Sequence, residues 1–164
     1  MEGDFFIRRA NAEDSPSILM CLAAAFEPYR NSYTPGAWLD TVLTPEALDR
    51  RFASMDILIA ISPQEGVVGT IAFAVPNGNE GHLRGMAVLP AWQSRGVAES
   101  LLLEAEDELV RRKCERITLD TTEPLQRATR FYEKRGYRRS GKVSDFFAMR
   151  LHEYVKELRR SSPG

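Results

Sequence analysis

The sequence predicts an α/β (α+β) domain in which flanking helices cover a mixed, mostly antiparallel central sheet. Helical and β-branched apolar patterns follow one another in the order β-α-α-β-β-β-α-β-α-β-β. The single strand–helix–strand unit in the middle requires a parallel pair, because one helix must cross between its strands. Since 43% of the 164 residues are hydrophobic, we expect one domain over 1–164, with a core from about 5 to 151 and a C-terminal tail over 152–164.

The N-terminal third is predicted to contain one strand and then helices. Residues 4–9 (DFFIRR) form the strand, and residues 14–16 (DSP) have the polar cap and first-turn proline of a helix start. Apolar residues then recur at helical spacing until Pro28. After a polar, aromatic connection, further helices are expected over 35–43 and from Thr44 onwards.

The middle of the chain has the pattern of three antiparallel strands. Residues 56–62 (DILIAIS) are a continuous apolar run, and residues 67–75 and 82–89 are rich in strand-forming residues. Stretches with Gly, Pro and Asn separate the strands at 63–66 and 76–81. Such short connections predict a meander.

The last part alternates helices and strands. Residues 96–113 form a long amphipathic helix whose final turn, Arg111-Arg112-Lys113, suits the negative end of the helix dipole. A later helix ends at Gly136, a residue that readily adopts the left-handed conformation of a helix C-terminus. The other expected elements are a strand at 116–122, a helix at 125–135, strands at 137–142 and 144–151, and a helical tail at 154–160.

The charge of the chain bears on which partners it can bind. The formal net charge of −1 argues against a nucleic-acid partner. The charge is uneven: residues 1–90 carry 6 basic and 11 acidic side chains, and residues 91–164 carry 16 and 12. An anionic ligand would prefer the C-terminal half, although an excess of solvated arginines explains the imbalance equally well.

Cysteine and histidine are scarce. Cys21 and Cys114 do not form a disulfide framework, and His82 and His152 have no zinc-site spacing, so we expect no metal. The chain has neither an N-terminal leader pattern nor an apolar run of about 18 residues. We therefore expect a cytoplasmic protein without a membrane partner, either a monomer or a homodimer.

The segment from Val88 to Ala98 (VLPAWQSRGVA) has the features of an anion site. A strand ends at Pro90, and a short loop leads into a helix that opens at Gly96. The first N–H groups of a helix lack internal partners and attract anions. Gly96 lets an anion approach the backbone closely, and Arg95 adds positive charge. These features would suit a pyrophosphate; alternatively, Gly96 only permits a tight turn.

This segment resembles the acetyl-CoA loop of the GCN5-related N-acetyltransferases, whose pattern is Gln/Arg-x-x-Gly-x-Gly/Ala. Met86-Ala87-Val88-x-Pro90 looks like the family's pantetheine-pairing strand, and Ala128-x-x-Phe131-Tyr132-Glu133-Lys134-x-Gly136-Tyr137 looks like its last motif. The element order agrees from Phe5 to Leu151. The resemblance implies the acyl-CoA N-acyltransferase fold and direct acetyl transfer from acetyl-CoA to a primary amine of a small molecule, peptide or protein. It also implies cofactor contacts from Met86, Ala87, Val88, Gln93, Ser94, Arg95, Gly96, Val97 and Ala98.

The resemblance also suggests catalytic groups. Tyr132 is the expected general acid for the CoA thiolate, unless its ring is only part of the core. His82 is the first candidate for the base because an imidazole titrates near neutral pH. Glu80 is the second candidate, and water or the substrate alone is the third possibility.

The acceptor side is less defined by sequence. Tyr29, Arg30 and Tyr33 could recognise a polar or carboxylated amine, or could belong to a surface loop. Many family members carry an Asn near the start of the last helix, where this chain has Leu125, so that cofactor contact is in doubt. Two other classes stay open. A non-catalytic CoA- or acyl-CoA-binding regulatory module fits the same loop, whereas a protein-interaction domain of the same fold would have no affinity for CoA.

Overall fold

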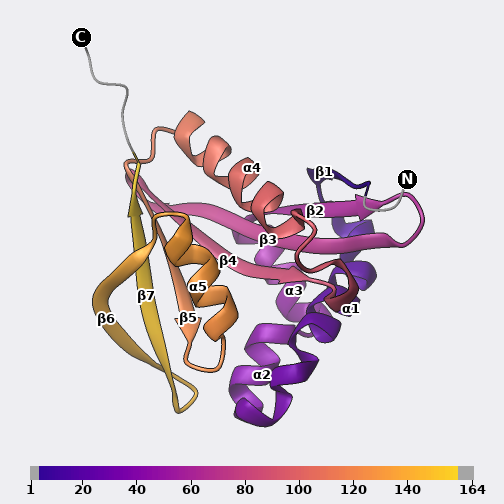
Figure 1. Cartoon of the computed structure of the whole chain (residues 1–164), viewed down its shortest axis with the longest axis horizontal. Helices are drawn as coiled ribbons and strands as arrows, with labels where there is room; N and C mark the ends of the chain where they lie inside the picture. Colours follow the sequence, from indigo (N-terminus) through magenta and orange to yellow (C-terminus); the bar gives the residue numbers. More distant parts are fainter. Residues whose placement is uncertain (1–3, 159–164) are drawn as a thin grey trace.

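The protein folds around one seven-stranded sheet, as seen in a computed structural model that describes residues 4–158 (Figure 1). The strand order is β1-β2-β3-β4-β5-β7-β6, and every neighbouring pair is antiparallel except β4 and β5. This arrangement confirms the predicted mixed, mostly antiparallel sheet. The strands are β1 (Phe6–Arg9), β2 (Asp56–Ser62), β3 (Gly66–Asn77), β4 (Glu80–Val88), β5 (Arg116–Thr122), β6 (Arg138–Phe146) and β7 (Met149–Glu157).

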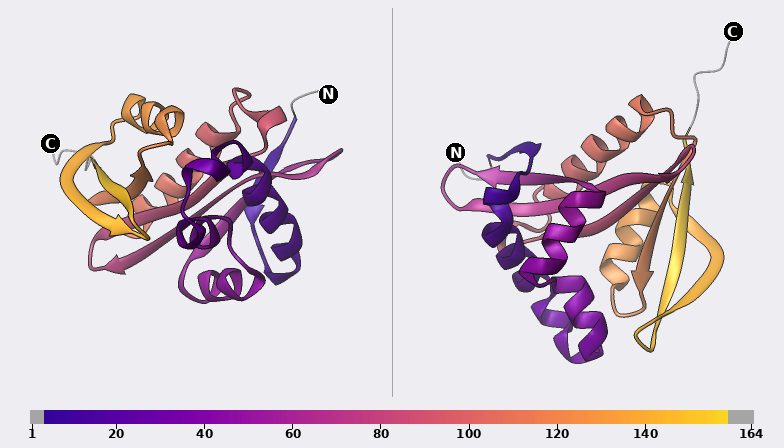
Figure 2. Two further views of the ribbon diagram at one scale, coloured as in Figure 1. Left: turned by 90° about the horizontal axis from the view of Figure 1, so that it is seen from below. Right: turned by 180° about the vertical axis from the view of Figure 1, so that it is seen from behind.

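Helices cover both faces of the sheet (Figure 2). Alternate residues of β2 enter two separate cores: Leu58 and Ala60 pack on the α4 side, whereas Ile57 and Ile59 pack on the α1 side. Because both faces are covered, β2 is a continuous apolar run. The helices are α1 (Ser15–Phe26), α2 (Pro35–Val42), α3 (Pro45–Ser54), α4 (Val97–Arg111) and α5 (Gln126–Lys134), with short 3₁₀ turns η1 (Ala12–Asp14), η2 (Glu27–Ser32) and η3 (Pro90–Trp92).

The parallel strands β4 and β5 are joined only at one end. Their pairing is limited to Glu80–His82 opposite Arg116–Thr118, and beyond it the strands diverge (Figure 1). On its other side, β4 shifts register against β3 near Gly85, which has a positive φ of 65°. A glycine tolerates this conformation, so the strand can bulge at the point where it leaves β5.

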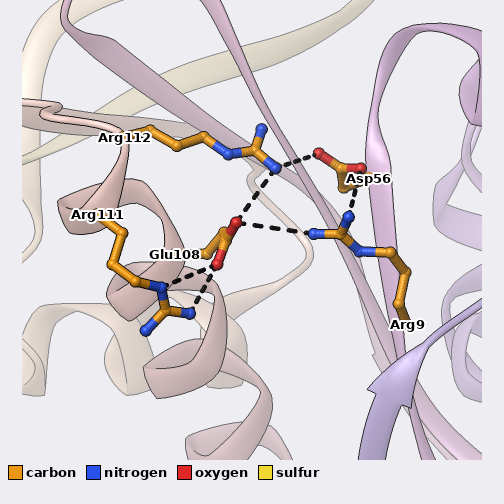
Figure 3. A network of polar contacts seen from close by, with 5 residues as sticks. All are labelled: Arg9, Asp56, Glu108, Arg111 and Arg112. Carbon is orange, nitrogen blue, oxygen red and sulfur yellow. Dashed lines mark hydrogen bonds and ion pairs between the residues drawn. The ribbon is translucent and has the colours of Figure 1, made fainter.

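A charged network fixes the end of α4 against the sheet (Figure 3). Arg112 bonds Asp56 of β2 at 2.7 Å and approaches Glu108 at 3.4 Å. Arg9 of β1 approaches the same two carboxylates, while Arg111 contacts only Glu108. The network is largely exposed, so screening by solvent keeps the contribution of each of its pairs to stability small.

The C-terminal part differs from the sequence prediction. Residues 152–157 are strand β7, paired along β5, and not the start of a tail or of a helix over 154–160. The turn between β6 and β7 lies at Phe147 and Ala148, both with positive φ, instead of near residue 143. Neither residue is a usual turn former, so the sequence pattern did not indicate a turn at this position. The core thus reaches at least residue 157, and positions 159–164 lie outside the described residues.

The other predicted elements are confirmed with small shifts in their ends. The predicted bounds of β2 and β5 match the structure. Gly96 caps α4 from a left-handed conformation (φ 85°) instead of being its first residue. Within the described part of the chain, no helix is long and apolar enough to cross a membrane.

Candidate active site

A cavity of about 670 Å³ occupies the gap between the diverging strands. Residues from β4 and β5 line it, together with the loop before α4, helix α5 and the segments around η2, α2 and α3. Helices α4 and α5 pack on one face of the sheet and α1 and α3 on the other. The cavity therefore connects the two faces.

The loop before α4 forms a polar cradle in this cavity. Ser94 and Gly96 both have positive φ, of 65° and 85°. The Gln93 amide donates to the Val88 carbonyl at 3.2 Å, and the Arg127 guanidinium of α5 bonds Gln93 Oε1 at 2.9 Å and Ser94 Oγ at 2.7 Å. The cradle thus combines a helix N-terminus with a fixed cation, as a phosphate group requires.

Seven of the nine predicted cofactor residues line the cavity, namely Met86, Ala87, Val88, Gln93, Ser94, Gly96 and Ala98. Two do not. The Arg95 guanidinium lies 4.9 Å from the centre of the Trp92 ring, and the Val97 side chain is 1% exposed in the core. For these two positions only the backbone is left to meet a ligand.

Arg127 and Arg135 are site residues that sequence reasoning missed. Arg127 lines the cavity from α5, and Arg135 lines it from the C-terminal cap of that helix. The Arg135 guanidinium stacks 4.0 Å from the Phe131 ring centre and pairs with Glu99 at 3.0 Å. The excess of basic residues after position 90 was the available signal. It could not indicate which arginines reach the loop.

Tyr132 lies on the α4–α5 side of the cavity. Its ring belongs to the core, 5.3 Å from the Phe131 ring and 5.7 Å from the Tyr137 ring, and the residue is 6% exposed. Its hydroxyl makes no hydrogen bond to any residue within 4–158. Burial raises the pKa of Tyr132, so the phenol stays protonated and can act as a proton donor.

His82 lies on the opposite face of the sheet. Leu83 points into the core under α4, so its neighbours His82 and Arg84 point to the α1–α3 side. His82 Nδ1 is 2.8 Å from the Thr118 hydroxyl, and Nε2 is 3.9 Å from Asp120 Oδ2. Burial lowers the pKa of His82, which keeps the imidazole neutral at pH 7. No sequence motif points to Asp120.

Glu80 is not brought into the site. Its carboxylate accepts a hydrogen bond from Arg116 Nε at 2.9 Å, at the joined end of β4 and β5, and it does not line the cavity. Glu80 shares a strand face with His82 but sits two residues farther from the gap. Of the two candidate bases, only His82 lines the cavity.

Two of the three predicted acceptor residues reach the cavity. Tyr29 and Tyr33 line it, and the Tyr33 hydroxyl lies 2.7 Å from that of Thr122 on β5. Arg30 instead lies over the Trp38 ring at 5.2 Å, is exposed, and approaches Glu27 at 3.4 Å. The η2 segment therefore walls the acceptor side through its tyrosines.

Comparison with known proteins agrees with this geometry. Residues 22–137 match the family model described as "Acetyltransferase (GNAT) family". The protein belongs to this family of acetyltransferases.

Solved structures of low sequence identity share the fold. The PaiA N-acetyltransferase of Thermoplasma acidophilum, solved in complex with coenzyme A, has a TM-score of 0.76 and 19% identity, covering 94% of this chain and 99% of that one. The ribosomal-protein-S18-alanine N-acetyltransferase of Escherichia coli also has a TM-score of 0.76, with 14% identity over 98% and 97% of the two chains. A GNAT-family acetyltransferase of Staphylococcus aureus Mu50 has a TM-score of 0.77 and 18% sequence identity, and the match covers 95% of this chain and 100% of that one. No curated protein matches the chain.

Proposed function

We propose that the protein transfers the acetyl group of acetyl-CoA directly to a primary amine. One observation carries this proposal: a phenol and an imidazole approach the same cavity from opposite faces of the sheet, through Tyr132 and His82. A protein that only binds CoA needs the loop cradle but has no need for a proton donor and a proton acceptor on either side of the gap. The arrangement separates the leaving thiol from the incoming amine.

The cradle and β4 would hold the acyl donor. The Gln93–Arg127 pair and the start of α4 offer donors and positive charge to a pyrophosphate. Beyond His82, β4 has no pairing with β5, so its edge is free to bond the amides of a pantetheine arm. The N–H groups near the Gly85 bulge would face the thioester oxygen and stabilise the negative charge that develops on it.

Two side chains would move the protons. His82 Nε2 accepts the proton that an ammonium must lose before its nitrogen can attack. Asp120, 3.9 Å from that nitrogen, stabilises the resulting imidazolium. As the C–N bond forms and the C–S bond breaks, Tyr132 donates its proton to the departing sulfur. The acylated nitrogen then loses its second proton to solvent, and His82 releases the first one there as well. Tyr132 takes one proton back up, so one proton is released overall for each acetyl group transferred.

The cysteines support direct transfer without an acyl-enzyme. Cys21 is 1% exposed, and burial raises the pKa of its thiol to about 12. Cys114 is also buried, at the end of α4, and neither residue lines the cavity. A nucleophilic cysteine requires an accessible thiolate, which neither site provides.

The proposal is tested by following free CoA thiol in mixtures of the protein, acetyl-CoA and a panel of primary amines. Amine-dependent thiol release supports it. If CoA raises the melting temperature but no amine accelerates thiol release, the protein is a CoA-binding module and the proposal is wrong.

A further inference from the structure

Arg51 is a buried cation on the wall of the cavity. It comes from α3, is 8% exposed, and lines the cavity beside the bulge of β4. A Cβ built on Gly85 would lie 2.6 Å from Arg51 Nη1, so the guanidinium packs directly on the bulge. Across residues 4–158, no hydrogen bond or ion pair engages this guanidinium.

The neighbouring charges do not neutralise Arg51. Asp40 of α2 also lines the cavity, but its carboxylate is bonded at 2.7 Å by Arg84. Two guanidinium groups thus face one carboxylate. Burial and the nearby Arg84 lower the pKa of Arg51 to about 10, which leaves it fully charged at neutral pH. The Asp40 carboxylate is therefore shared, and Arg51 has no counter-ion of its own among residues 4–158.

A buried guanidinium is costly when the carboxylate near it, here that of Asp40, is already held by another arginine. The group offers a planar fork of N–H donors that matches a carboxylate. The acyl donor has its own cradle near Gly96 and Arg127, on the α4–α5 side. Arg51 comes from the helices of the opposite face, the side on which His82 and Tyr33 also lie.

We propose that the acceptor is an amino carboxylate, such as an amino acid, whose carboxylate is held by Arg51 while its amine faces His82 and Asp120. This inference rests on the proposed acetyl transfer and specifies its substrate. It moves carboxylate recognition from Arg30, which is exposed and points away, to a residue that sequence spacing could not connect with the site. Asp120 provides the complementary negative charge for the ammonium end.

The test compares acids with their own amides. The standard amino acids and β-alanine are each assayed beside the corresponding carboxamide, with acetyl-CoA as donor. The amide keeps the amine and the side chain but loses the anion. Its ammonium group is also more acidic, so more neutral amine is present and any preference for the acid cannot come from deprotonation.

For the best acid, we expect kcat/KM to exceed that of its amide by about 10²-fold, the order expected when a hydrogen bond between two charged groups is lost. Arg51→Gln should abolish this preference, because it should slow acetylation of the acid but not of the amide. If Arg51→Gln does not fold, Arg51→Met replaces it in the same comparison. Arg50→Gln is the matched control, because Arg50 is exposed on the same helix, and it should keep the preference.

The outcomes separate this inference from the proposed function. If wild-type protein acetylates amides as well as acids, or if the preference survives in Arg51→Gln, carboxylate binding by Arg51 is wrong while acetyl transfer stands. If nothing is acetylated, melting temperatures of the CoA-saturated protein decide the inference. If amino acids raise the melting temperature of the wild type but not that of Arg51→Gln, they support the carboxylate site. If they do not raise the melting temperature of the wild type, the inference is wrong.

Discussion

His82 Nδ1 lies 2.8 Å from the Thr118 hydroxyl, and these two residues form the last pair at which β4 and β5 are joined. The imidazole is therefore held by the closed end of the sheet at the mouth of the gap. When Nδ1–H donates to Thr118, Nε2 carries the free lone pair on the side of Asp120. The splayed strands thus both open the cavity and hold the imidazole at its edge.

His82→Gln tests this role through the pH dependence of kcat/KM. In the wild type, log kcat/KM should rise with pH through a pKa below the ordinary imidazole value of 6.5, because burial disfavours the charged ring. The variant should lose that rise and keep its affinity for CoA. The same depressed pKa means that protonation favours the unfolded chain, so His82 lowers stability as the pH falls through 6.5.

Glu80→Gln distinguishes the rival base. We expect the rise with pH to persist in this variant, because the Glu80 carboxylate pairs with Arg116 outside the cavity. A profile that is unchanged in His82→Gln but lost in Glu80→Gln would reverse the assignment. A rise that follows only the pKa of each amine would mean that no protein base acts.

Tyr132→Phe removes one proton donor and little packing. The ring contacts with Phe131 and Tyr137 remain, so the melting temperature should stay within a few degrees of the wild type. Turnover should fall by about 10²–10⁴-fold, the usual contribution of a general acid. Full activity in steady-state assays would show that Tyr132 is only a core residue.

A pair of substitutions at Gly96 tests the phosphate cradle. Nothing lies within 4 Å of an added Cβ, and Asn and Asp tolerate the left-handed backbone similarly. Gly96→Asp adds negative charge that Gly96→Asn does not, so calorimetry should show CoA binding weakened about tenfold more by Asp than by Asn. Arg127→Gln should also weaken binding. Equal affinities in the two Gly96 variants would place the pyrophosphate elsewhere.

Glu106 tests the core beneath the site. It is 7% exposed on α4, accepts the Tyr137 hydroxyl at 2.7 Å, and pairs with Lys156 of β7 at 3.1 Å. Glu106→Ala leaves a buried hydroxyl and a cation unsatisfied, so urea unfolding should show a loss of about 1–3 kcal/mol. Glu104→Ala, at an exposed position of the same helix, should stay within about 0.5 kcal/mol. Equal effects would mean that the cluster contributes nothing specific.

The parts of the site that could be predicted from the sequence are those formed by short, contiguous motifs. The loop before α4, the strand ahead of it and Tyr132 are contiguous motifs, and β2 and β5 have unambiguous apolar runs. The arginines of the site could not be identified in this way. Arg51 and Arg127 reach the cavity only because β4 and β5 separate and bring α3 and α5 to the same space. The sequence also could not show that Glu80, the second candidate base, pairs with Arg116 outside the cavity.

Mass spectrometry of the products formed from acetyl-CoA and an amine decides whether the protein transfers the acetyl group directly. We expect one N-acetylated amine for each free CoA, at a rate that falls sharply in both His82→Gln and Tyr132→Phe, with no acetylated protein accumulating. Release of CoA with only acetate as product, or an N-acetyl product formed equally fast by both variants, would contradict it.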